Sequence, residues 1–295
     1  QLQVLTRARR SEVNKRSRIK VEMRALHDHI WREYQGFSVL ENGKVKTKKI
    51  FSDFWGKASL HLLAHFPHAS QLLELGEQGL RQLSKEHNLK FRQTTIDKLL
   101  FAASESVSKP LTDLSSELFL LKQKLKDYEW HTQTIRDYEA EIERIFIQTD
   151  GVLLLTVPGI GLITAAEIYS EMGDLSHYSN AGQLIKKAGT NPTIKQSGAS
   201  QGYYGRISKQ GNAHLRSAVY NAGRSLCVHN ERLKPFSNRL KEKGKKTGQI
   251  YIAMGNKFLR IAFSMLQKQT PFEWDEPTFN YKQEVFKKLT LPISA

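Results

Sequence analysis

The turn at residues 157–161 has the residue types that bring a backbone close to a phosphate. An apolar stretch leads into the sequence VPGIG, and a predicted helix with small residues follows it. Gly159 and Gly161 would let the chain approach a phosphate, and the N-terminus of the following helix offers free N–H groups and a positive dipole. This pattern is typical of a helix-hairpin-helix that grips nucleic acid. A tight turn between packed helices, without a ligand, is the alternative.

A glycine-rich stretch at residues 186–212 supplies a second set of candidate groups. It contains five glycines and five hydroxyl residues, and it is expected to form an irregular loop or loose hairpin. Ser197 lies in its sequence KQSG, between Lys195 and the more distant Arg206 and Lys209. Taken alone, a serine in such a loop is usually a turn residue.

The distribution of charge favours binding of phosphate. The 295-residue chain carries 45 Lys and Arg against 29 Asp and Glu, a net charge of +16. Residues 181–260 contain 16 of these cations against 2 acids, and residues 1–50 contain 13 against 5. Such an excess indicates a nucleic acid or an anionic membrane as partner. Its concentration in blocks with few offsetting carboxylates favours a phosphate backbone.

Other chemistries find less support in the sequence. The single cysteine, Cys227, excludes a disulfide framework and a multi-Cys zinc site, and it fits a reducing compartment. Four histidines lie within residues 61–87, but no Cys or closely spaced carboxylate joins them, so helical packing is expected instead of metal binding. The longest apolar run, residues 151–166, is short for a membrane span and contains proline and glycine.

Hydrophobic periodicity predicts that helices surround these groups. The first 30 residues lack Pro and Gly and are expected to form a basic amphipathic helix, and residues 36–49 are expected to form a loop or a short hairpin around Asn42-Gly43. The carboxylates Glu167, Glu171 and Asp174 are interpreted as the exposed side and end of the helix after VPGIG. The other expected elements are short strands at 193–196 and 205–209, a helix capped by Asn212 and a last helix at 249–267.

A heptad pattern covers residues 111–146. Its first half is apolar from Leu111 to Tyr128, whereas Thr132 and Glu139 are polar positions in the second half. One long helix packed in an intramolecular bundle would explain the pattern. We expect an intermolecular coiled coil, which would make the protein a homodimer or tetramer.

The predicted fold is therefore mainly α. A basic helix and a long coiled coil precede a helical domain that contains the hairpin and the glycine-rich loop. The expected segments are a basic helical region at 1–108, a coiled coil at 109–150, a helix-hairpin-helix domain at 151–270 and a tail at 271–295.

Three stretches together resemble the C-terminal transposase domain of the insertion sequence 110 family, with its 116, 902 and 1111 relatives. They are TVPGIGLITAAEIYSEMGDLSHYSNAGQLIKKAGTNP, KQSG and GRISKQGNAHLRSAVYNAG, within about residues 145–270. The basic helix and heptad stretch before them are similar to the middle region of that family. The resemblance implies a DNA recombinase with a serine nucleophile, and the serine motif of the family carries over onto Ser197-Gly198.

The resemblance also implies cofactors and partners. Family members carry an N-terminal RuvC-like domain whose four acidic residues bind Mg²⁺, and the members studied use a bridge RNA to choose DNA. No Asp or Glu precedes Glu12 in this chain, so none of the four can be assigned. We expect a truncated copy that holds no cofactor itself and is inactive without the acidic domain and its Mg²⁺. Its expected partners are DNA and a bridge-type guide RNA, in a bacterial or archaeal cytoplasm at the nucleoid, without a membrane.

Within this resemblance, Lys195, Arg206 and Lys209 are the cations expected to stabilise the pentacovalent phosphorus. Ser200 and Ser208 compete with Ser197 as nucleophile, and no general base can be named. The remaining expected phosphate contacts are Gly159, Gly161 and Arg216.

Two other functions stay open. The hairpin and the basic block also fit a non-catalytic protein that binds DNA or RNA in an architectural or regulatory role. A helix-hairpin-helix subunit of a repair nuclease would explain the VPGIG turn but not the KQSG loop.

Overall fold

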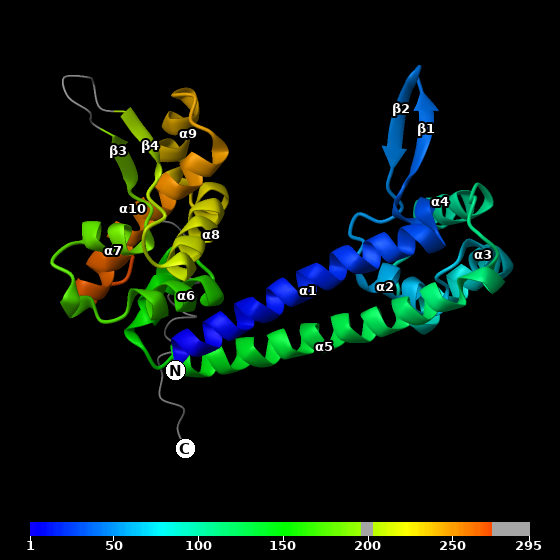
Figure 1. Cartoon of the computed structure of the whole chain (residues 1–295), viewed down its shortest axis with the longest axis horizontal. Coiled ribbons are helices and arrows are strands. Elements are labelled where there is room, and N and C mark those ends of the chain that lie inside the picture. The colour runs from blue at the N-terminus through cyan, green and yellow to red at the C-terminus, as the bar shows by residue number, and fades with distance from the viewer. Residues whose placement is uncertain (196–202, 273–295) are drawn as a thin grey trace. The chain divides into compact units, whose positions relative to one another are not determined.

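A computed structural model describes residues 1–195 and 203–272, and helices dominate this part of the chain (Figure 1). The mainly α fold expected from the sequence is confirmed. The chain divides into two compact units. We call residues 12–134 the middle unit, and residues 1–11 together with 135–295 the C-terminal unit. These boundaries fall inside two long helices, whereas the sequence pattern places boundaries at 108 and 150.

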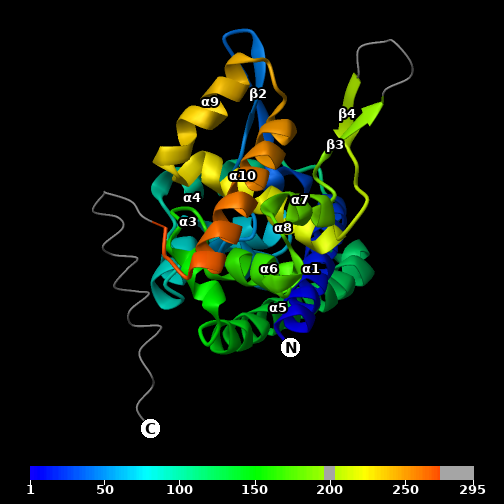
Figure 2. The ribbon, with the colours of Figure 1, turned by 90° about the vertical axis from the view of Figure 1, so that its left-hand side faces the viewer.

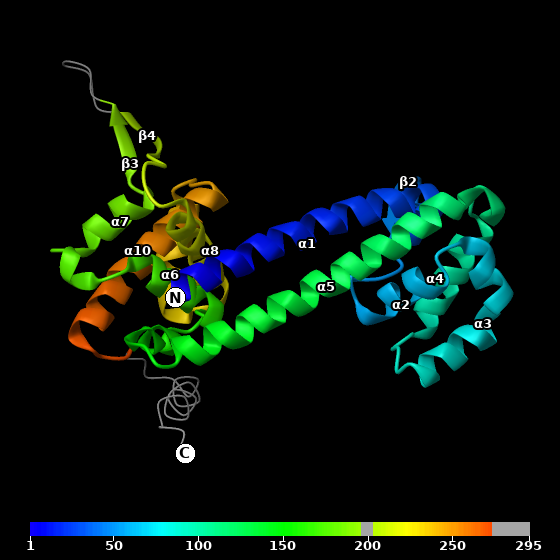
Figure 3. The same cartoon turned by 60° about the horizontal axis from the view of Figure 1, so that its bottom comes forward.

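The two long helices, α1 (Leu2–Ile30) and α5 (Ser115–Phe146), contribute to both units. The predicted basic helix is confirmed as α1, which can run for 29 residues because no Pro or Gly interrupts it. In the middle unit, Lys124 Nζ of α5 lies 2.6 Å from Glu22 Oε2 of α1. The same distance separates His131 Nδ1 from Glu12 Oε2, so the two helices run side by side there (Figure 3).

The apolar seam of α5 is buried inside the chain itself. Its first half belongs to the core of the middle unit and its second half to that of the C-terminal unit. The buried seam residues of these two cores are Leu114, Leu121, Leu125, Tyr128, Ile142 and Phe146. The polar seam position Glu139 accepts a hydrogen bond from Arg9 Nε of α1 at 2.8 Å. The prediction that this seam pairs with a second copy is therefore wrong, because its apolar face is already covered. A dimer or tetramer stays a prediction.

The middle unit combines a hairpin with short helices. The hairpin predicted at Asn42-Gly43 is confirmed, and both turn residues have positive φ, 51° and 71°. Its described elements besides α1 and α5 are η1 (Arg32–Gln35), β1 (Phe37–Glu41), β2 (Lys44–Lys48), α2 (Lys57–His65), α3 (Ala69–Glu86), α4 (Gln93–Ser104) and η2 (Leu111–Leu114). Their core surrounds Trp31 and Tyr34, which are almost completely buried.

The C-terminal unit is a helical bundle with one small hairpin. The helix capped by Asn212 is confirmed as α8, since Asn212 Oδ1 accepts hydrogen bonds from the backbone N–H groups of His214 and Leu215. The last predicted helix is confirmed as α10. The described elements are η3 (Asp150–Thr156), α6 (Leu162–Met172), η4 (Leu175–His177), α7 (Ala181–Ala188), β3 (Pro192–Lys195), β4 (Tyr203–Ile207), α8 (Ala213–His229), η5 (Glu231–Leu233), α9 (Lys234–Glu242) and α10 (Thr247–Lys268).

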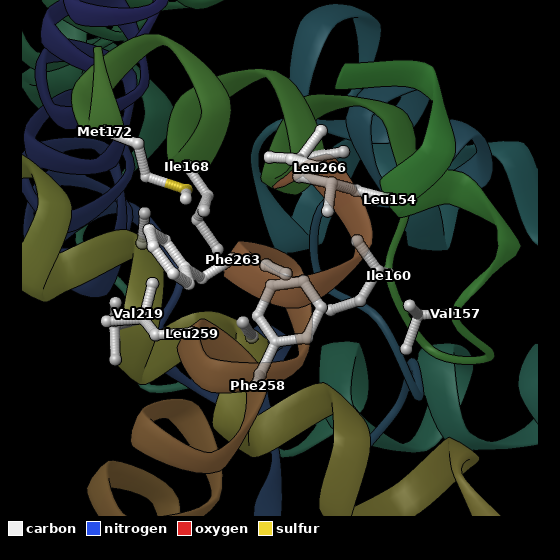
Figure 4. Packing of buried hydrophobic residues seen from close by; sticks show 14 of the residues in the cluster. Leu154, Val157, Ile160, Ile168, Met172, Val219, Phe258, Leu259, Phe263 and Leu266 are labelled. Atoms are coloured by element: carbon white, nitrogen blue, oxygen red, sulfur yellow. The ribbon is translucent and has the colours of Figure 1, made fainter. Parts of the chain in front are cut away.

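The core of the C-terminal unit lies between α6, α8 and α10, which pack side by side (Figure 2). Phe258 and Phe263 of α10, Ile168 of α6 and Val219 of α8 belong to one cluster of buried residues (Figure 4). Helix α10 contacts α8 so closely that a Cβ at Gly223 would stand 1.9 Å from a backbone oxygen of α10. Within residues 1–195 and 203–272, no helix is long and apolar enough to cross a membrane.

Candidate nucleic-acid interface

The VPGIG turn packs against the end of α8. The Gly159 carbonyl accepts a hydrogen bond from Ser225 Oγ at 2.6 Å, and the Pro158 carbonyl accepts one from Asn230 Nδ2 at 2.9 Å. Gly159 has a φ of 92°, and a Cβ there would stand 3.3 Å from Cβ of His229. Glycine at this position therefore serves the turn and its contact with α8.

Gly161 lies at the exposed end of the same turn. It is the N-cap residue of α6, and no atom lies within 4 Å of the position that its Cβ would occupy. Because glycine has no side chain to cap the helix, the N–H groups of the first turn of α6 stay available to an anion. The segment before the turn is the 3-10 helix η3 and not an α-helix. The helix-hairpin-helix stays a prediction.

The carboxylates of α6 correct a prediction from the sequence. The sequence pattern places Glu167, Glu171 and Asp174 on the exposed side and end of the helix. Asp174 is exposed, and it accepts a hydrogen bond from the backbone of Ser176. Glu167 and Glu171 are instead buried, with 8% and 2% of their surface exposed. Charged residues are almost never buried unless they are paired.

Arginines and amides surround the buried carboxylates. Glu171 accepts hydrogen bonds from Arg7 Nε at 2.7 Å, Asn212 Nδ2 at 2.7 Å and Gln3 Nε2 at 3.0 Å. The carboxylate oxygens of Glu167 lie 3.8 Å from Arg9 Nη1 and 3.7 Å from Arg10 Nη1. We call these seven residues the α6 ion network. Because Asn212 caps α8, Glu171 ties the first turns of α1 to the start of α8.

The pKa values of the two carboxyl groups are shifted in opposite directions. Burial raises the pKa of Glu167 above its ordinary value, and the more distant Arg10 and Arg9 offset this only in part. Burial also opposes ionisation of Glu171, but the hydrogen bonds from its three donors outweigh that effect. They hold the pKa of Glu171 below its ordinary value. Glu171 is thus the ionised centre of the network.

Strands β3 and β4 carry the glycine-rich loop. The two short strands expected here are confirmed as an antiparallel pair that joins Lys195 to Tyr203. Ser197 and Ser200 lie within residues 196–202, outside the described part of the chain. Lys195 and Tyr203 are the described residues that flank this segment.

Hydrogen bonds close the base of this hairpin. Ser208 Oγ donates to Asn191 Oδ1 at 2.9 Å. Arg216 Nη1 donates to two backbone carbonyls, one of them that of Lys209, at 3.1 Å each. Arg216 therefore clamps the hairpin onto α8, and its role as a phosphate contact stays a prediction. Arg206 and Lys209 are exposed, so their charges can meet a phosphate.

A groove of 720 Å³ opens beside α10 and η5. None of its lining residues is acidic, and four of them are cationic. These cations are Arg232, Lys257, Arg260 and Lys268. Lys257 Nζ also stands 4.6 Å above the ring of Phe236. A concave surface with this charge fits a phosphate backbone.

The described side chains do not fit a Mg²⁺ site. Within the described ranges, no three His, Cys, Asp or Glu residues gather in a way that could hold a metal ion. The rings of His65 and His87 lie 4.5 and 4.4 Å from that of His61, without a carboxylate among them. Glu167 and Glu171 face arginines, whereas Mg²⁺ needs free oxygen ligands. We therefore assign no chemical step to a metal on these residues.

Residues 152–238, from η3 to α9, match the family model of the transposase family IS116/IS110/IS902. This stretch contains the turn, the buried carboxylates and the hairpin described above. The resemblance to this family that the sequence motifs indicate is therefore confirmed over this stretch. The match leaves the middle unit outside its bounds.

Three relatives illustrate how far the similarity of this chain to known proteins extends. It is 34% identical to a pilin gene-inverting protein of Moraxella bovis over 124 residues, which are 41% of this chain and 38% of that protein. It is 28% identical to a transposase for insertion sequence element IS1111A of Coxiella burnetii over 144 residues, 48% and 39% of the two chains. A protein of insertion element IS116 of Streptomyces clavuligerus is 22% identical over 199 residues, 67% and 47%. The chain thus spans less than half the length of these curated relatives.

Sequence reasoning missed the α6 ion network. Arg7 and Glu171 are 164 positions apart, so no local pattern joins them. One signal could have indicated burial, because Ala165, Ala166 and Ile168 make α6 apolar on nearly all sides. Two glutamates one turn apart on such a helix require partners from elsewhere in the chain.

Proposed function

We propose that this chain acts in DNA transposition or site-specific recombination, with Ser197 as the nucleophile. The match of residues 152–238 to the transposase family carries the proposal, since that stretch contains the KQSG loop. By their names, one relative inverts a gene and another transposes an insertion element. Both names denote rearrangement of DNA, which requires phosphodiester bonds to be broken and rejoined.

In the proposed step, Ser197 Oγ forms a bond to a DNA phosphorus while one phosphorus–oxygen bond to a sugar breaks. The serine gives up its proton, and the departing sugar oxygen takes one up. Cations lower the energy of the negatively charged phosphorane that lies between these states. Arg206 and Lys209 support this role through their exposure beside the loop, and Lys195 through its place at the end of β3.

DNA binding in this proposal uses two surfaces of the C-terminal unit. The basic groove beside α10 meets the phosphate backbone, and the open N-terminus of α6 at Gly161 offers N–H groups to a phosphate. Contacts of this kind fix the position of the protein on the backbone and carry no information on the base sequence. Sequence choice would then come from a guide RNA, as the family resemblance implies, and from further copies of the protein.

The test is a denaturing gel of labelled DNA, with this chain produced together with a RuvC-like acidic domain from the same family. A covalent protein–DNA adduct should form, and Ser197→Ala should abolish it while DNA binding stays nearly unchanged. Ser200→Ala and Ser208→Ala are the matched controls and should retain the adduct. The chain without the acidic domain should exchange no strands. An adduct that survives Ser197→Ala would place the nucleophile elsewhere.

A non-catalytic nucleic-acid-binding role is the second candidate. The acid-free groove beside α10 favours it, because binding of a backbone there needs no serine. In this case nucleic-acid binding would persist and no variant would alter any covalent product. The same gel therefore separates the two functions.

A further inference from the structure

We propose that the middle unit binds one phosphodiester strand of a nucleic acid in a groove at the starts of α2 and α4. The groove has a volume of 790 Å³, and all its lining residues belong to the middle unit. It lies outside the stretch that matches the transposase family and outside both surfaces of the proposed function. This site therefore goes beyond that function and stands independently of it.

Charge is the first observation. Five cations from three segments line the groove, against a single carboxylate. The cations are Lys49 after β2, Lys57 at the start of α2, and Lys90, Arg92 and Lys98 around the start of α4. The carboxylate, Asp53, already accepts a hydrogen bond from the backbone N–H of Trp55 at 2.9 Å. The groove thus has a strong local excess of positive charge, as a polyanion requires.

Some of these cations are held in place by the backbone. Lys57 Nζ donates to the carbonyl of His87 at 2.9 Å, and Lys98 Nζ donates to that of Lys49 at 3.2 Å. These bonds satisfy part of each ammonium group but do not neutralise its charge. The groove is therefore partly preorganised, which reduces the entropy lost when an anion binds.

Two helix starts add to the positive potential of the same groove. Gly56, Lys57 and Ala58 line it at the start of α2, and Arg92 and Thr94 line it at the start of α4. No side-chain hydrogen bond from the N-cap residue satisfies the first N–H groups at either end. Uncapped N–H groups beside lysines are suitable donors to phosphate oxygens.

The concave shape favours a single strand over a duplex. A flexible strand can follow a pocket of this size, whereas duplex DNA has a persistence length of about 50 nm and does not bend into it at low cost. Phe51 also lines the groove and is partly exposed. A positively charged groove with an aromatic ring is the combination that single-strand-binding proteins use, since every base can stack on a ring.

The experiment uses photocrosslinking in the full chain, because the C-terminal unit is expected to bind nucleic acid as well. A p-benzoylphenylalanine replaces Thr94 in the groove or, as the control position, Gln82 on α3. Each protein is mixed with labelled single-stranded DNA, single-stranded RNA or duplex DNA of equal length and irradiated. We expect a strong adduct at position 94 with a single strand, a weak one with the duplex, and background at position 82. The single strand that gives the higher adduct yield shows whether the groove binds DNA or RNA.

Charge variants complete the test. Lys49→Gln, Lys90→Gln and Arg92→Gln together should lower the adduct at position 94 by about tenfold and the salt slope of single-strand binding by about 2. The matched control, Lys85→Gln, Lys122→Gln and Lys126→Gln, removes the same charge from exposed positions outside the groove and should leave the adduct unchanged. Equal loss in both variants, equal adducts at positions 94 and 82, or an equal or stronger adduct with the duplex would overturn the proposal. An inactive Ser197 would not affect any of these readouts.

Discussion

The two units bury polar groups in different ways. The C-terminal unit buries charge, because Glu171 is ionised and is held by Arg7 and other donors. The middle unit also buries one carboxylate, Glu12, beside Lys15 and His131, but its most deeply buried titratable side chain is the neutral His27, which has no exposed surface. Removing one partner of a buried ion pair leaves an unpaired charge in the core, which destabilises the fold. A buried neutral histidine destabilises the fold when it takes up a proton. We therefore expect the C-terminal unit to be sensitive to the loss of a partner, and the middle unit to be sensitive to pH.

The two units also differ in the features on which the proposals rest. The stretch that matches the family, residues 152–238, belongs to the C-terminal unit, which also contains the ion network and the close contact of α8 with α10. The middle unit carries a basic groove without any of the expected catalytic groups.

The largest effect is expected where α8 meets α10. Gly223→Ala would place a Cβ 1.9 Å from the carbonyl oxygen of Tyr251, so the two helices must separate. The expected loss of stability is about 3 kcal/mol, at the upper end of the usual range for overpacking. Chemical denaturation of the C-terminal unit measures it.

Gly248→Ala is the matched control in α10, since no atom lies within 4 Å of its Cβ position. Alanine there should stabilise the helix by about 0.5–1 kcal/mol. If Gly223→Ala matched this gain, α8 and α10 would not be in close contact.

The pH response of the middle unit comes next. Burial lowers the pKa of His27 to about 4, even though its Nε2 lies 3.1 Å from the carbonyl of Pro67, to which it can donate. Its Nδ1 is buried without a hydrogen-bond partner. The folded pKa is below the unfolded value, so the stability from neutral His27 is complete above about pH 6.5. It should fall by about 3 kcal/mol as the pH drops to about 4.

Hydrogen exchange of the core around Trp31 and Tyr34, followed from pH 7 to pH 4.5, measures this loss. His27→Gln removes the titrating group and should flatten the profile, whatever its effect on stability at neutral pH. A profile that is equally steep in both proteins would assign the pH response to other groups.

The α6 ion network should respond to removal of its central charge. Glu171→Gln replaces a carboxylate by an amide whose NH₂ faces the donors Arg7 and Asn212. We expect a loss of about 2 kcal/mol, because hydrogen bonds to charged groups contribute about 1.5–3 kcal/mol and Arg7 is partly exposed. Glu143→Gln changes an exposed carboxylate on α5 and should have almost no effect. Urea denaturation of the two variants tests whether Glu171 is the centre of the network.

The smallest changes in stability are expected at the VPGIG turn, where Gly159 is expected to matter for folding and Gly161 for DNA binding. Gly159→Val should cost about 1–2 kcal/mol, since the residue has positive φ and faces α8. Gly161→Val should leave stability nearly unchanged and weaken DNA binding by crowding the start of α6. Thermal denaturation and duplex-DNA titration of both variants distinguish these effects. Weaker binding with Gly159→Val alone would show that the helix start does not contact DNA.

Several features of this protein follow from local sequence. The absence of Pro and Gly before Gln35 determined α1, Asn42-Gly43 determined a tight hairpin turn, and Asn212 determined the start of α8. The motifs around residues 157–212 determined the family. Each of these signals acts between residues only a few positions apart, so the sequence displays it directly.

Tertiary structure alone decided which surfaces these elements cover. The heptad stretch of α5 had two possible partners, and the folded chain buries its seam against its own cores. The sequence pattern predicted that Glu167 and Glu171 are exposed. They are buried instead, because arginines more than 150 positions away in the sequence pair with them. A helical pattern specifies that a face will be apolar or charged, but not which other face it meets. That choice depends on the free energy of contacts between distant segments, which exist only once the chain has folded.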